Sequence, residues 1–153
     1  WEIYRTLRLR ALNESPDAFG GTYADAQRHD DVQWQNRLVD LTLDSDLPLL
    51  GMVDDDAVGL AWGKIELADR TTAHLYQMWV APNCRGCGLG RELLHQAIDW
   101  ARHQGAARVV LGVTLGNSPA QALYARAGFT PVGKTEPLRP GSSLLSQPME
   151  LSF

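Results

Sequence analysis

Residues 79–91 read Trp79-Val80-Ala81-Pro82-Asn83-Cys84-Arg85-Gly86-Cys87-Gly88-Leu89-Gly90-Arg91, an apolar run that passes through a glycine-rich turn into a helix-forming run. The first turn of a helix leaves about four backbone N–H groups unpaired, and the aligned peptide dipoles add roughly half a positive charge there. Glycines at positions 86, 88 and 90 let a ligand approach the backbone, and Arg85 adds a fixed charge. The stretch therefore predicts an anion site, and a pyrophosphate would suit it.

Two common phosphate-binding patterns do not fit this turn. A Walker-type loop ends in Gly-Lys-Ser/Thr, whereas this turn runs Gly90-Arg91-Glu92 and has no hydroxyl to hold a metal. A dinucleotide fingerprint would need a glycine in place of Arg91 and an acidic residue about twenty positions further on, where residues 109–111 are apolar. The pattern that remains is R-x-x-G-x-G, formed by Arg85, Gly88 and Gly90 after a strand that ends V-x-P.

Length and charge narrow the class of protein. The 153 residues suffice for a single domain with one sizeable core. A net charge of −4 argues against nucleic acid as the main partner and is compatible with a cationic substrate. No apolar run approaches the roughly eighteen residues of a membrane span, and the first residues lack the order of a signal peptide. We therefore expect a cytoplasmic protein that does not cross a membrane.

Two short motifs invite a metal interpretation. Cys84 and Cys87 form a C-x-x-C pair, but a zinc site would need a second pair or histidines at ligand spacing, and a redox motif would not lie among glycines. Residues 54–56 are three adjacent aspartates, which are more typical of a solvated hairpin turn than of a metal site. We expect two reduced thiols and no metal.

The apolar periodicity predicts alternating helices and strands. We expect helices over residues 1–12, from a cap at Asp30 or Asp31 to about residue 41, and over 88–104 and 119–127. Strands are expected over residues 47–53, 57–66, 72–80, 107–115, 130–134 and 147–153, with a loop over 136–146. In the first helix, Arg5, Arg8 and Arg10 are expected on an outer basic face. The helical crossover between strands 72–80 and 107–115 predicts that they pair in parallel.

A second motif spans residues 117–129, which read Asn117-Ser118-Pro119-Ala120-Gln121-Ala122-Leu123-Tyr124-Ala125-Arg126-Ala127-Gly128-Phe129. Alone, this pattern N-x-x-A-x-x-L-Y-x-x-x-G-F fits a short amphipathic helix with apolar residues in the core. It follows the R-x-x-G-x-G loop at the distance that one helix and one strand require. Together the two motifs resemble the GNAT family of N-acetyltransferases, and the resemblance covers residues 47–153.

The resemblance implies an α/β (α+β) fold with one N-acetyltransferase domain over residues 1–153. Its mixed central sheet is flanked by helices, and the parallel strands 72–80 and 107–115 splay at their carboxyl ends. The family usually opens with a strand before its first helix, and this chain begins in the helix. That strand is therefore expected upstream of Trp1, or the sheet is one strand short.

The resemblance also implies acetyl-CoA as co-substrate. The pantetheine arm is expected to enter the gap between the splayed strands and to pair with backbone as an added strand would. The pyrophosphate is expected on the amides of residues 85–91. The cofactor-binding residues implied are Trp79, Val80, Arg85, Gly86, Cys87, Gly88, Leu89, Gly90, Arg91, Asn117 and Tyr124.

The implied reaction is direct transfer of an acetyl group from the thioester to an amine. The amine must be neutral to attack, the carbonyl oxygen must be stabilised as it gains charge, and the departing thiolate must be protonated. The family resemblance implies a backbone N–H near Val80 as the carbonyl partner. Tyr124 is the candidate acid for the thiolate, and the alternative is that it only packs or orders the cofactor.

The general base is the open part of the mechanism. Many family members use a glutamate where this chain has Gln77, which cannot take a proton. Strand alternation would place His74, Tyr76, Met78 and Val80 on one face of strand 72–80. His74 is thus the first candidate, with Glu66 on the neighbouring strand acting through water as the second. A purely structural histidine is the alternative.

Three functions are compatible with these motifs. The first is acetyl transfer to a primary amine of a small molecule, which requires a closed pocket under residues 136–146. The second is acetyl transfer to a protein N-terminus or lysine, which requires an open groove. The third is a non-catalytic acyl-CoA sensor, against which the presence of Asn117 and Tyr124 counts. A homodimer is compatible with the family, in which dimers are common.

Overall fold

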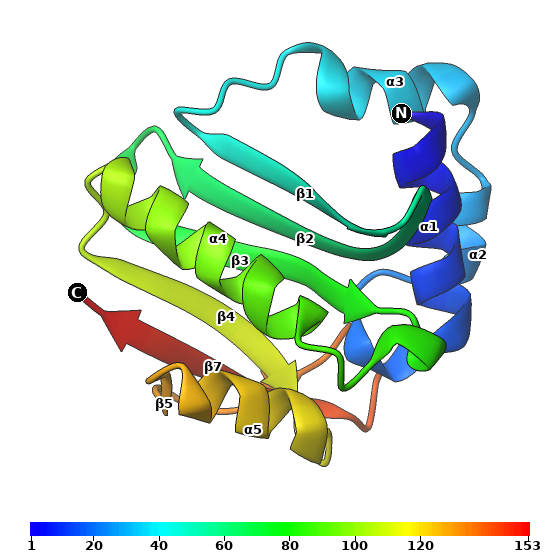
Figure 1. The fold of residues 1–153 in the computed structure, drawn as a ribbon. Coiled ribbons are helices and arrows are strands. Elements are labelled where there is room, and N and C mark those ends of the chain that lie inside the picture. The colour runs from blue at the N-terminus through cyan, green and yellow to red at the C-terminus, as the bar shows by residue number, and fades with distance from the viewer.

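A mixed sheet of seven strands runs through the computed structural model, which describes residues 1–153 (Figure 1). The strands are β1 (Asp46–Val53), β2 (Asp56–Glu66), β3 (Asp69–Val80), β4 (Arg108–Thr114), β5 (Thr130–Pro131), β6 (Glu136–Pro137) and β7 (Leu145–Ser152). The helices are α1 (Glu2–Glu14), α2 (Tyr23–Gln27), α3 (Asp31–Val39), α4 (Leu89–His103) and α5 (Ser118–Arg126), and the short 3-10 turns are η1 (Pro16–Ala18) and η2 (Pro82–Cys84).

The strand order is β1-β2-β3-β4-β7-β5, with β6 paired to β7. Only β3 and β4 pair in parallel, and the other pairs are antiparallel. The parallel pairing runs from Thr72 opposite Arg108 to Leu75 opposite Leu111. Beyond these residues β3 continues to Val80 and β4 to Thr114 without pairing with each other, although β3 stays paired with β2 and β4 with β7. The predicted mixed sheet with two splayed parallel strands is confirmed.

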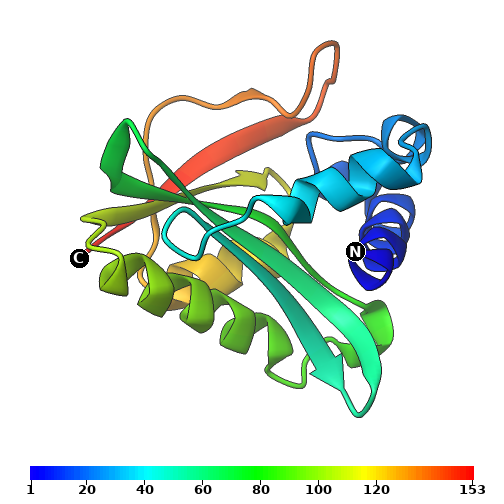
Figure 2. The ribbon, with the colours of Figure 1, turned by 90° about the horizontal axis from the view of Figure 1, so that it is seen from above.

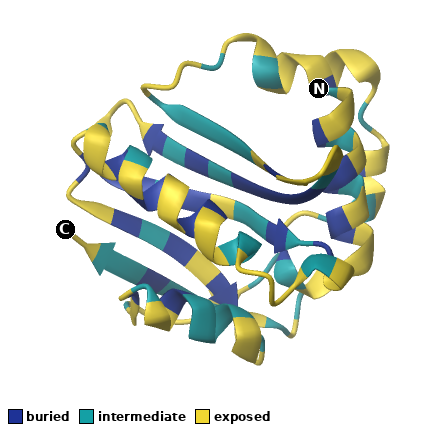
Figure 3. Ribbon diagram, viewed as in Figure 1, coloured by how far each residue is buried: buried dark blue, intermediate teal, exposed yellow.

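Helices cover both faces of the sheet, as Figure 2 shows from above, with α4 and α5 on one side and α1 and α3 on the other. The side chains of α4 that face the sheet are buried, and its outer side chains are exposed (Figure 3). These buried residues are Leu93, Leu94, Ala97, Ile98 and Ala101. Burying each leucine or isoleucine contributes roughly 1.5–3 kcal/mol, so this stripe is enough to hold α4 on the sheet.

A β-bulge in β3 overturns the predicted alternation. Leu60 pairs with Trp79 and Trp62 with Tyr76, so Gln77 and Met78 together face one residue of β2. Gln77 has φ +59, an uncommon value for a residue with a side chain. The bulge separates the residues that the alternation had placed together. Met78 and Val80 pack toward α4, in the same core as Ala73 and Leu75, whereas His74 and Tyr76 lie on the opposite face.

The N-terminal helices differ from the prediction in two ways. Arg8 is 8% exposed and lies over the Phe19 ring at 4.4 Å, so it is not on an outer basic face. Its burial lowers the pKa of the guanidinium to about 10. The short helix α2 was not predicted, whereas α3 begins as expected with Asp30 as cap, in a capping box with Gln33.

The strands after α5 differ from the prediction in one strand and in the loop that follows it. The expected strand 130–134 is reduced to Thr130–Pro131, and residues 136–137 add a short strand inside the expected loop. Both pair with β7. None of the helices is both long enough and apolar enough to cross a membrane.

Candidate active site

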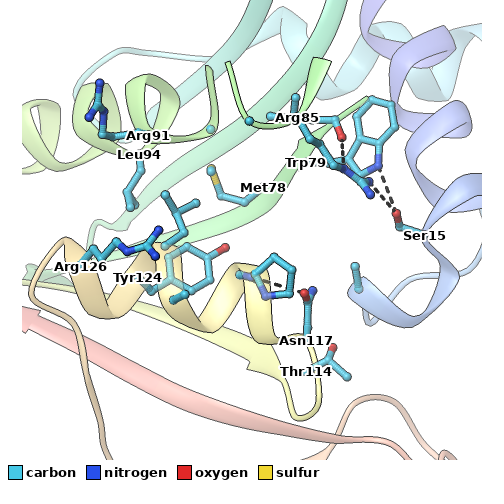
Figure 4. A pocket seen from close by; sticks show the side chains of 18 of the residues that line it. Ser15, Met78, Trp79, Arg85, Arg91, Leu94, Thr114, Asn117, Tyr124 and Arg126 are labelled. Carbon is cyan, nitrogen blue, oxygen red and sulfur yellow. Dashed lines mark hydrogen bonds between the residues drawn. The ribbon is translucent and has the colours of Figure 1, made fainter. Parts of the chain in front are cut away.

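A cavity of about 1230 Å³ opens where β3 and β4 diverge. Its walls come from the end of β3, the loop before α4, the first turns of α4, the end of β4, α5 and the segment after α1 (Figure 4). The cavity therefore joins the two sequence motifs in space.

The loop and the start of α4 present unpaired backbone amides to this cavity. Gly88 is the N-cap of α4 with φ +92, and no side chain caps the helix. The N–H groups of residues 86–91 donate to no acceptor within the protein. A Cβ on Gly86 would meet no atom within 4 Å, so the space in front of this backbone is open. Six adjacent donors at a helix N-terminus form the kind of site that binds phosphate groups.

Arg85 is engaged within the protein. Its Nε donates to the carbonyl oxygen of Val80 at 2.8 Å, and its Nη2 donates to Oε2 of Glu14 at 2.8 Å. Trp79 Nε1 also donates to Oε2 of Glu14, at 2.8 Å. Arg85 thus ties the loop to β3 and α1, so its guanidinium is not free for a phosphate.

Two other arginines line the cavity without an ion pair. Arg91 comes from the first turn of α4, and Arg126 from the last turn of α5. Neither takes part in a salt bridge or a side-chain hydrogen bond. Arg126 was not predicted from the sequence, although this residue stands four positions after Ala122, another lining residue of the same helix. These are the cations that remain available to an anionic ligand.

Tyr124 lies on α5 at the inner wall of the cavity and is 6% exposed. Its ring packs against Phe129, with centroids 6.0 Å apart. Figure 4 shows its hydroxyl pointing toward the open centre of the cavity, where it has no hydrogen-bond partner within the protein. Burial raises the pKa of the phenol, so the neutral form is favoured.

Asn117 caps the helix that carries Tyr124. Its side-chain oxygen accepts from the N–H of Ala120 at 3.4 Å, and Pro119 occupies the first turn. Asn117 also lines the cavity. The second motif therefore builds a short helix whose start and whose tyrosine both face the cavity.

The profile of the Acetyltransferase (GNAT) family matches residues 9–129, which include both motifs and the cavity walls between them. The chain belongs to the GNAT family. The sequence-based recognition of the family is confirmed.

Individual GNAT relatives differ in the acceptor that their names give. A mycothiol acetyltransferase of Beutenbergia cavernae is 35% identical over 128 residues, which are 82% of this chain and 40% of that protein. A streptothricin acetyltransferase of Streptomyces lavendulae is 44% identical over 64 residues, which are 42% of this chain and 34% of that protein. This chain thus spans about 40% of the length of the first of these relatives.

A solved GNAT structure matches over almost its whole length. The ribosomal-protein-alanine N-acetyltransferase of Brucella melitensis superimposes with a TM-score of 0.74 at 25% identity, covering 100% of this chain and 96% of that one. The similarity confirms the fold.

The two candidate bases of this GNAT domain lie away from the cavity. His74 stacks on Tyr76, with ring centroids 5.9 Å apart, four residues before the first β3 residue that lines the cavity. Four residues of strand correspond to about 13 Å. Glu66 lies at the turn end of the β2–β3 hairpin, where it pairs with Lys64 at 3.3 Å. The structure does not bring either residue to Tyr124.

The acidic side chains that line the cavity are Glu14 and Asp17, and the sequence analysis identified neither. Both follow the predicted end of the first helix, in a turn that has no catalytic pattern of its own. They reach the cavity because this turn packs against the end of β4, where Thr114 Oγ1 donates to the Asp17 carbonyl oxygen at 2.7 Å. No sequence signal nearby indicates that contact.

The remaining predicted cofactor residues contribute in different ways. Trp79, Val80, Gly90 and Cys87 line the cavity. Leu89 does not line the cavity, and its side chain packs toward Gly51 and Gly59 of the hairpin. Both cysteines are free, and Cys87 Sγ donates to the Cys84 carbonyl oxygen at 2.6 Å. No three metal-ligating side chains gather anywhere in the protein.

Glu14→Gln is expected to lower the Kd of CoA about threefold to tenfold, because it removes a negative charge from the cavity lining and releases the Arg85 guanidinium for a phosphate, and to lower the free energy of unfolding by less than about 1 kcal/mol. Calorimetric titration of CoA and denaturant unfolding measure the two effects. Glu2→Gln, on the first turn of α1, is the matched control. Unchanged CoA affinity in Glu14→Gln would contradict the role of this ion pair.

The contribution of the Glu14–Arg85 ion pair to stability depends on pH. Burial opposes ionisation of Glu14, but hydrogen bonds from Ser15 and Trp79 and the Arg85 guanidinium outweigh it and hold the pKa of Glu14 below its ordinary value. A carboxyl whose folded-state pKa is lowered stabilises the fold above its unfolded pKa of about 4.3, and this contribution is lost as the pH falls through the folded-state value.

The contribution of Tyr124 to stability has the opposite pH dependence. Because burial raises its pKa, its contribution to stability is present below the unfolded pKa of about 10 and is lost as the pH rises through the folded-state value. We expect the free energy of unfolding to fall more between about pH 8 and about pH 11 in the wild type than in Tyr124→Phe. Urea titrations at both values measure it, and equal losses in the two proteins would refute the assignment.

Proposed function

We propose that this domain transfers an acetyl group from acetyl-CoA to a primary amine of a small molecule. The observation that carries the proposal is that one cavity is lined both by the start of α4 and its preceding loop, whose backbone amides are unpaired, and by Tyr124, whose hydroxyl is unpaired. The amides suit the pyrophosphate of the donor, and the hydroxyl suits its sulfur. Family membership supports acetyl-CoA as the donor.

The cavity supports one orientation of the donor. Its phosphates would lie on the amides of residues 86–91, with Arg91 and Arg126 providing the neutralising charge. The pantetheine arm would lie along residues 78–80, whose backbone is not paired with β4 because the parallel ladder ends at Leu75. This arrangement directs the thioester toward Tyr124.

The proposed chemistry is direct transfer. The neutral amine attacks the thioester carbon, a backbone N–H near Val80 stabilises the oxygen as it gains charge, and the carbon–sulfur bond breaks. Tyr124 donates its proton to the departing thiolate and becomes a phenolate, and the surplus proton on the acylated nitrogen passes through water to that phenolate, which leaves the amide, CoA thiol and neutral Tyr124. Burial keeps the phenol protonated, and the same dry surroundings make the thiolate a stronger base.

Two contacts between segments beside the cavity favour a small acceptor over a peptide. Arg139 Nη1 donates to the carbonyl oxygens of Pro16 at 3.1 Å and Phe19 at 2.9 Å, which ties the loop before β7 to the segment after α1. Leu144 of that loop lines the cavity. A peptide would need an open groove at this point. The names of the mycothiol and streptothricin relatives also support a small molecule.

The test is thiol release from acetyl-CoA across a panel of small amines and short peptides, together with calorimetric titration of CoA. Release with small amines and none with peptides is the expected result. Release with peptides alone would indicate a protein acceptor. Tight CoA binding without release for any member of the panel would indicate an acyl-CoA sensor and refute acetyl transfer.

A further inference from the structure

The two ends of the cavity carry unpaired charges of opposite sign. Arg91 and Arg126 stand on the side formed by α4 and α5, and Asp17 stands on the side formed by η1. The other acid of the cavity, Glu14, is neutralised by Arg85 at 2.8 Å. The carboxylate of Asp17 has neither an ion pair nor a hydrogen bond within the protein, and it is the cavity's only acid of this kind.

The backbone under Asp17 is fixed from two directions. The buried side chain of Thr114, at the end of β4, donates to the Asp17 carbonyl oxygen at 2.7 Å. Arg139 holds the carbonyl oxygens on either side, those of Pro16 and Phe19. Because its backbone is held in this way, the exposed side chain of Asp17 stays within reach of this end of the cavity, which favours a role in ligand recognition.

The surroundings of Asp17 indicate which part of a ligand would bind there. Pro16, Leu115 and Leu144 line the same end of the cavity and are apolar. A carboxylate favours the protonated form of an amine beside it, and a protonated amine cannot attack a thioester. Asp17 is therefore better suited to a second positive charge of the acceptor than to the amine that reacts.

Resting on the proposed function, we infer that Asp17 is the residue that selects the acceptor and that the acceptor is a diamine. One amine is acetylated near Tyr124, an apolar spacer lies along Leu115 and Leu144, and the second, protonated amine binds Asp17. A charge-assisted contact of this kind corresponds to a preference of about tenfold to a hundredfold.

The test compares three acceptors of similar length: cadaverine, pentylamine and δ-aminovalerate, whose far ends are positive, apolar and negative. For the wild type we expect kcat/KM to be about tenfold to a hundredfold higher for cadaverine than for pentylamine, and lowest for δ-aminovalerate. Asp17→Asn should lose this order of preference, mainly because KM for cadaverine rises, and its affinity for CoA should be unchanged. Asp17→Glu should recover part of the preference, and Asp40→Asn, on the exposed C-cap of α3, should keep all of it.

The outcomes separate this inference from the proposed function. Asp17→Asn that retains the full preference for cadaverine would overturn the role of Asp17. Wild-type acetylation of all three acceptors at similar rates would overturn the diamine class and leave acetyl transfer intact. Absence of thiol release with every amine, despite CoA binding, would overturn the proposed function itself.

Discussion

Tyr124→Phe is expected to lower kcat about a hundredfold to ten-thousandfold while changing the Kd of CoA by no more than about twofold. The hydroxyl lies in a buried position, faces the cavity and has no partner in the protein, so removing it leaves no other group unpaired. The aromatic ring remains, and with it the packing against Phe129. The loss should therefore fall on the step in which the thiolate leaves.

Steady-state thiol release and calorimetric titration of CoA measure the two quantities. Tyr76→Phe is the matched control, because Tyr76 is 48% exposed on β3 and does not line the cavity. We expect it to keep wild-type kcat. If Tyr124→Phe weakened CoA binding as much as turnover, Tyr124 would order the cofactor rather than act as the acid.

Gly86→Ala is expected to weaken CoA binding about tenfold to a hundredfold. Gly86 has φ +81, a conformation that costs about 1–2 kcal/mol for alanine. The strain would be relieved by turning the backbone, and the amides that face the cavity would turn with it. Each amide that no longer reaches a phosphate oxygen removes one charge-assisted hydrogen bond.

Gly105→Ala separates the effect on the ligand from the effect on stability. Gly105 follows the opposite end of α4 with φ +80, and as at Gly86 a Cβ would meet no atom within 4 Å. The two substitutions should lower the free energy of unfolding by similar amounts, whereas only Gly86→Ala should raise the Kd of CoA. A comparable loss of affinity in Gly105→Ala would show that general destabilisation causes the effect.

The arginine of the R-x-x-G-x-G motif has a different role in this structure from the one expected, because it contacts Glu14, which also binds Trp79. This arginine was expected to add a charge for the phosphates, but the guanidinium closes on Val80 and Glu14. Arg91, which follows the motif directly, and Arg126, on α5, are the arginines of the cavity that have no ion pair. In this structure the motif therefore offers an anion its unpaired backbone amides, whereas its first side chain is engaged within the protein.

Local chemistry was enough to predict the parts of the site that lie within one motif. Glycines at 86 and 88 adopt positive φ, and α4 spans Leu89–His103, close to the predicted range 88–104. The order strand, helix, strand was enough to predict that β3 and β4 pair in parallel, because a helical crossover allows little else. Tyr124 was predicted to face the cofactor from the second motif, and it lines the same cavity as the loop.

The tertiary structure decided the features that depend on contacts between distant segments. Strand periodicity cannot reveal a bulge, which here depends on the register between β2 and β3 and sends His74 and Met78 to opposite faces. Asp17 reaches the cavity through a hydrogen bond from Thr114, which is 97 residues away in the chain. The sequence by itself thus determined the run of unpaired amides, because that run is built from one continuous turn and helix. The acceptor end was decided only by packing, because its side chains come from η1, the end of β4 and the loop before β7, and no local pattern joins them.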